Sequence, residues 1–65
     1  MAGFDIEKLK KLVDPQWNKR VDRYKKMGFS DEQKLADATA YKKKLISTYS
    51  AMNPEIVDYI NSLKY

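Results

Sequence analysis

The sequence predicts an all-α fold: a compact bundle of three principal helices with one additional short N-terminal helix. Its apolar residues recur at steps of three and four, as on one face of a helix, and no stretch alternates as a half-buried strand does. Proline and glycine fall between these segments, at Pro15, Gly28 and Pro54. With 65 residues and no linker rich in Gly, Ser or Pro, we expect residues 1–65 to form a single helical domain.

The first two segments are predicted to be separate helices. A short one runs from about Asp5 to Val13, and a longer one runs from Pro15 to Met27. Asp14 before Pro15 suggests an N-cap carboxylate followed by a proline at the first helical position. The apolar stripes of these segments are Ile6, Leu9, Leu12 and Val13, and then Trp17, Val21, Tyr24 and Met27.

The third segment is predicted to be the longest helix and the spine of the bundle. Gly28 favours a helix end, and Ser30 with Gln33 forms a capping box that starts a new helix at Asp31. This helix should extend to about Ala51, which gives it a length of about 30 Å. Its stripe consists of Leu35, Ala38, Tyr41, Leu45, Ile46, Tyr49 and Met52.

The fourth segment is predicted to run from Pro54 to about Lys64. Asn53 before Pro54 repeats the pattern of a cap followed by proline. The stripe here is Ile56, Val57, Ile60 and Leu63. We expect the second and fourth helices to fold back on the third, while the first caps an open end.

Composition excludes several chemistries. The chain has no Cys and no His, so disulfides, zinc fingers, iron–sulfur clusters and catalysis by imidazole or thiol are impossible. No carboxylates make a recognisable catalytic pair, since helix capping and a solvated face account for Asp31, Glu32 and Asp37. The two glycines form no phosphate-binding loop. We therefore expect no enzyme, no cofactor and no metal site.

Positive charge is concentrated in the first half of the chain. Residues 8–26 hold eight positive and two negative side chains, a local net charge of +6 within a total of +4. Three of the positive residues align along the second predicted helix, opposite its apolar stripe. Tyrosine is favoured at protein interfaces. We therefore expect a protein-interaction module that binds an acidic or amphipathic protein surface through Lys19, Arg23, Lys26, Tyr59 and Tyr65.

Two alternatives stay open. The first is non-specific nucleic-acid binding through Lys19, Arg20, Arg23, Lys26, Lys43 and Lys44. Sequence-specific binding by a helix-turn-helix fits poorly, because Asp31 and Glu32 would face phosphates. The second is a structural homo-oligomer, assembled through the small residues of the third predicted helix, which are Ala36, Ala40, Ser47 and Ala51.

Lys42 falls inside the apolar stripe of the third predicted helix. An unpaired ammonium is costly to bury. We expect its methylene stem to lie over the core while the amine reaches water. The alternative is an ion pair with a carboxylate of a partner.

One local resemblance involves the segments Met27-Gly28-Phe29 and Glu55 to Ile60. Together they resemble the two ends of a ubiquitin-associated domain, a three-helix module in which the corresponding loop and last helix contact ubiquitin. The middle helix predicted here is much longer than in that family. The bland interpretation is that Gly28 caps a helix and Phe29 fills the core.

No apolar run of the sequence is long enough for a signal peptide or a membrane span. We expect a cytoplasmic protein that does not associate with membranes. The small size suits a viral or mobile-element accessory protein, such as a virion component or a modulator of a host enzyme. It would then lie in the host cytoplasm or in the virion.

Overall fold

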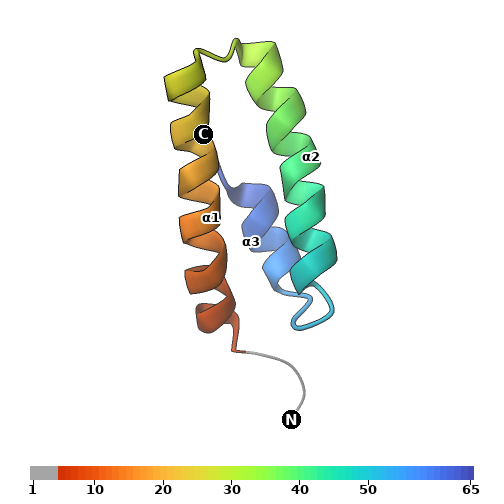
Figure 1. Ribbon diagram of the computed structural model, residues 1–65. Coiled ribbons are helices and arrows are strands. Elements are labelled where there is room, and N and C mark those ends of the chain that lie inside the picture. Colours follow the sequence, from red (N-terminus) through yellow and green to blue (C-terminus); the bar gives the residue numbers. More distant parts are fainter. Residues whose placement is uncertain (1–4) are drawn as a thin grey trace.

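Three helices make up the computed structural model, which describes residues 5–65 (Figure 1). Helices α1 (Ile6–Met27) and α2 (Asp31–Tyr49) form an antiparallel hairpin. The short α3 (Ile56–Ser62) packs against both, near the end where α1 begins and α2 ends. The all-α prediction is confirmed, in an elongated molecule of 44 × 17 × 15 Å. Within the described residues, no helix is long and apolar enough to cross a bilayer.

The predicted short N-terminal helix is wrong, because α1 continues through Pro15 without a break. Leu9, Val13 and Trp17 are all buried and follow one another at steps of four. They therefore lie on one face of a single helix, on both sides of the proline. Burying this continuous face offsets the loss of one backbone hydrogen bond at Pro15.

Asp14 does not cap a helix. Its carboxylate accepts a hydrogen bond from the hydroxyl of Tyr59 in α3. The N-cap of α1 is instead Asp5, whose Oδ1 accepts from the backbone N–H of Glu7 at 3.0 Å. No second helix therefore starts at Pro15. Asp14, which was predicted to cap it, makes a tertiary contact between α1 and α3 instead.

The turn between α1 and α2 follows the sequence prediction. Gly28 adopts the left-handed conformation (φ 66°, ψ 42°), and its N–H donates to the carbonyl of Tyr24. Phe29 packs on the ring of Tyr24, with 5.1 Å between centroids. The capping box is present, since the side chains of Ser30 and Gln33 each bond the other's backbone N–H.

The prediction of a long third helix as the spine is also wrong. The segment predicted for that role forms α2, which has 19 residues against 22 in α1, and the third helix has only 7. Before α3, the Oδ1 atom of Asn53 accepts from the N–H of Glu55 at 3.0 Å, so Pro54 belongs to a turn and α3 starts at Ile56. The backbone becomes extended at Leu63, which ends α3 early.

The main core cluster joins all three helices at the end where α3 packs. Its buried members are Leu9, Val13, Leu45, Ile56 and Ile60. Farther along the hairpin, Trp17, Tyr24 and Ala38 are buried as well. The buried face of α1 therefore extends well beyond the part that α3 covers.

Three residues of the predicted apolar stripes are exposed instead. Leu12, Met27 and Leu35 are 51%, 61% and 60% exposed. With only seven residues, α3 covers one part of the hairpin and leaves Leu35 without a helix against it. Once α1 is continuous, Leu12 falls beside its buried face instead of on it.

Replacing Pro15 by Ala should stabilise the protein. In the interior of an exposed helical segment, proline costs up to about 3 kcal/mol relative to alanine, because it removes an N–H donor and crowds the preceding turn. We expect a gain of about 1–3 kcal/mol, measured by urea unfolding followed by circular dichroism.

Asn18→Ala, at an exposed position of the same helix, is the matched control, and it should gain only about 0.5 kcal/mol. If a new helix began at Pro15, the proline would be well placed. Pro15→Ala would then be neutral or destabilising, and the continuous α1 would be contradicted.

Candidate functional site

Basic side chains of α1 line a hollow of about 240 Å³ between α1 and α2. The steps from Gln16 to Arg20, and from there to Arg23, are four and three residues, so these side chains share one flank of α1. Lys19 and, from α2, Tyr41 complete the lining. The helix therefore brings three predicted cationic residues, Lys19, Arg20 and Arg23, to one place.

Arg20 is held rigidly in this hollow. Its Nε and Nη2 atoms donate to the two carboxylate oxygens of Asp37 on α2, at 2.8 and 2.9 Å. The guanidinium carbon lies 4.5 Å from the ring centroid of Tyr41. The hydroxyl of the buried Tyr24 donates to the same carboxylate at 2.6 Å. This network ties α1 to α2 and fixes the direction of the guanidinium group.

The network shifts the pKa values of its members. Hydrogen bonds from Arg20 and then Tyr24 lower the pKa of Asp37. The hydrogen bond to Asp37 raises the pKa of Arg20. Burial, followed by the bond to Asp37, raises the pKa of Tyr24 to about 12. At neutral pH the network therefore contains a guanidinium, a carboxylate and a neutral phenol.

The other two cations of the hollow are exposed. The side chains of Lys19 and Arg23 make no hydrogen bond or ion pair with another described residue. Arg23 lies close enough to Asp37 to contribute to lowering its pKa. Since Asp37 compensates Arg20, the hollow keeps two uncompensated positive charges. An anionic group could bind them without breaking an existing ion pair.

The remaining predicted lysines do not line the hollow. Lys26 is exposed one turn beyond Arg23, and Lys44 is exposed one turn beyond Tyr41. Lys43 lies on the outer face of α2, where Ala36, Ala40 and Ser47 are also exposed. Self-association through this outer face stays a prediction. Nucleic-acid binding through the six basic residues also stays a prediction.

Tyr59 lies on a different side of α1. It is half-buried against the core, its hydroxyl bonds Asp14, and the Nζ atom of Lys10 lies 5.1 Å from its ring centroid. The bond to Asp14, followed by burial, raises the pKa of Tyr59 to about 12. The five helical steps from Asp14 to Lys19 turn the direction of the side chain by about 140°, so this tyrosine is remote from the hollow.

Tyr65 is also not part of the hollow. Its ring contacts that of Tyr24 edge-on, with 6.1 Å between centroids, and it is 48% exposed. The five residues expected to bind a partner, Lys19, Arg23, Lys26, Tyr59 and Tyr65, are therefore not brought to a single surface.

Three residues that shape the hollow are not predicted from the sequence. The sequence pattern places Asp37 on a solvated face and Tyr41 only in the core, whereas Asp37 bonds Arg20 and Tyr41 lines the hollow. Gln16 donates from Nε2 to the hydroxyl of Tyr49 at 2.8 Å and to the carbonyl of Leu12 at 2.9 Å. The one available signal was the spacing of Gln16, Arg20 and Arg23. No group of three potential metal ligands occurs among residues 5–65.

Replacing Asp37 by Asn should destabilise the protein at pH 7. The change removes the charge that Arg20 and Tyr24 share, in a pair whose side chains are 32% and 27% exposed. Such charge-assisted bonds predict a cost of about 1–2 kcal/mol. The free energy of unfolding, measured in urea, tests this value.

The difference in free energy of unfolding between Asp37→Asn and the native protein should depend on pH. The folded pKa of Asp37 lies below its unfolded value of about 3.9. Its stabilisation is therefore complete well above that value and is lost as pH falls through the folded pKa. Asp22→Asn, on the exposed side of α1, should cause little change at any pH. An unfolding difference for Asp37→Asn that stayed constant into acid would contradict the ionised network.

No family model matches this chain, and no curated protein and no solved structure is significantly similar to it. The charges and contacts of the hollow are therefore the basis for a functional proposal.

Proposed function

We propose that the chain is a non-enzymatic interaction module that docks a carboxylate-rich protein surface against the hollow between α1 and α2. The observation that carries this proposal is the pair of uncompensated cations, Lys19 and Arg23, beside the fixed guanidinium of Arg20. A side chain held in one conformation loses little entropy when a ligand binds. The N–H groups of Arg20 that do not bond Asp37 can thus orient a carboxylate, while its two exposed neighbours supply charge.

The burial and contacts of the aromatic rings favour a protein over a nucleic acid as the binding partner. Single strands gain affinity when their bases stack on exposed aromatic rings. Here the ring of Tyr41 is covered by Arg20, Trp17 and Tyr24 are buried, and Tyr59 is engaged with Asp14 and Lys10. The basic surface therefore offers charge without a row of stacking platforms.

Charge reversal at Lys19 and Arg23 together should weaken binding to an acidic peptide about tenfold. Each exposed cation contributes up to about 1 kcal/mol, and reversal adds repulsion of the partner's carboxylates. The probe is a fluorescein-labelled hexaglutamate peptide, titrated at low salt and followed by fluorescence anisotropy. Labelled duplex DNA and labelled oligothymidine are titrated in parallel.

The matched control is Lys11→Glu combined with Lys43→Glu, which changes the net charge equally at exposed positions outside the hollow. It should weaken binding much less than Lys19→Glu with Arg23→Glu. Equal loss in both double variants would mean that only net charge matters and would overturn the proposed site. Tighter binding of DNA than of the peptide, with a steep salt dependence, would favour the nucleic-acid alternative instead.

A further inference from the structure

A second hollow, of about 360 Å³, lies between α2 and the C-terminal tail (63–65). It is lined by residues from α2, from the last turn of α3 and from the tail, and none of them lines the hollow between α1 and α2. They are Leu35, Lys42, Asn61, Leu63, Lys64 and Tyr65. The volume falls in the lower part of the range of about 300–1,000 Å³ that ligand sites occupy.

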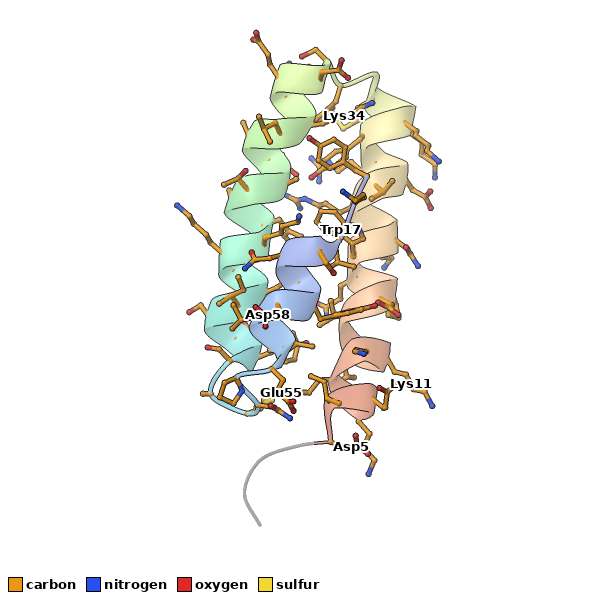
Figure 2. All side chains as sticks on the ribbon, turned by 180° about the vertical axis from the view of Figure 1, so that it is seen from behind. Asp5, Lys11, Trp17, Lys34, Glu55 and Asp58 are labelled. Atoms are coloured by element: carbon orange, nitrogen blue, oxygen red, sulfur yellow. The ribbon has the colours of Figure 1, made fainter. Side chains whose placement is uncertain are left out.

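This hollow is open because the tail is fixed to α1. The indole Nε1 of Trp17 donates to the carbonyl of Lys64 at 3.0 Å, and Tyr65 contacts Tyr24. Figure 2 shows Trp17 between the two long helices, beyond the end of α3. With the tail drawn toward α1, nothing in the described chain covers Leu35 on α2, which stays 60% exposed.

One end of the hollow is cationic. The Nζ atom of Lys42 donates to the carbonyl oxygens of Leu63 at 2.7 Å and of Asn61 at 3.2 Å, at the C-terminus of α3. The expectation that this amine only reaches water is therefore corrected. These two bonds use two of its three N–H donors. Burial, followed by the charge of Lys64, lowers the pKa of Lys42, so the two ammonium groups lie near each other.

The rest of the lining is largely apolar. Leu35 and Tyr65 are among the most exposed large apolar side chains of the described residues, and Leu63 is half-buried beside them. No Asp or Glu side chain lines the hollow, and neither lysine forms an ion pair within the described residues. The lining thus combines an uncompensated positive end with an apolar wall.

We propose that this hollow binds an acidic, amphipathic peptide segment of a partner protein, in which a carboxylate neighbours an aliphatic side chain. The aliphatic group covers Leu35 and Tyr65, and the carboxylate lies between Lys42 and Lys64. Charge complementarity selects this occupant, because a neutral apolar segment would cover both ammonium groups without supplying a negative charge to either.

The test is a titration of the ¹⁵N-labelled full chain with acetyl-Leu-Asp-amide, followed by ¹H–¹⁵N correlation spectra. We expect saturable shifts at Leu35, Lys42 and residues 63–65, with millimolar affinity. Acetyl-Leu-Asn-amide lacks the charge and acetyl-Gly-Asp-amide lacks the aliphatic group, so each should bind at least about threefold more weakly.

Variants separate the two halves of the site. Leu35→Ser should weaken binding roughly fivefold, and Lys64→Gln about threefold. The matched controls are Met27→Ser, which alters an equally exposed apolar side chain, and Lys43→Gln, which removes an outer lysine. Both controls should bind like the native protein. Lys64→Gln also keeps the test decisive if Leu35→Ser alters the fold.

Four outcomes would overturn this inference. The first three are the absence of saturable shifts, equal binding of the neutral and acidic dipeptides, and equal losses in the site and control variants. Shifts confined to Arg20, Arg23 and Tyr41 would also reject it while supporting the hollow between α1 and α2. Because the two hollows share no residue, failure here leaves the proposed function standing, and the reverse also holds.

Discussion

The continuous buried face of α1 is the constraint on which the rest of the molecule depends. Leu9 and Val13 contribute to the core cluster that α3 joins, Trp17 anchors the tail, and Tyr24 bonds Asp37 of α2. Leu9 and Val13 lie before Pro15, and Trp17 and Tyr24 lie after it. Both sets of contacts form together only when the two halves of α1 share one helix axis. A break at Pro15 would rotate one half of this face away from its partners, so the tertiary contacts decide the course of the helix.

Local signals predicted the hairpin well, because their physical cause lies within a few residues. Gly28 is the residue that adopts a positive φ at lowest cost, and Ser30 with Gln33 satisfies the free N–H groups of the next helix. Asp14 before Pro15 carries an equally good local signal and failed. There the competing contact, from the hydroxyl of Tyr59, lies 45 residues away and no local pattern contains it.

The candidate site was predictable in its charges but not in its pairing. The spacing of Lys19 and Arg23 along one helix flank is a property of the sequence alone. That Asp37 pairs with Arg20, and that Lys42 reaches the carbonyls beyond α3, depends on how the helices pack. The short length of α3 was also not predictable from the sequence, since Leu63 continues the helical spacing of apolar residues although its backbone is extended.

Pairing within the fold, more than the number of basic residues, decides which cations a partner can use. Arg20 is compensated by Asp37, and Lys10 lies beside Glu7 and the ring of Tyr59. A ligand that competed for these groups would first have to replace bonds already made. Lys19 and Arg23 require no such exchange. Lys42 bonds two carbonyl oxygens and its Nζ atom lies 5.4 Å from the ring centroid of Trp17, but it forms no ion pair with a described residue. The two hollows, on different sides of the hairpin, therefore each offer an acidic surface cations that form no ion pair within the described residues.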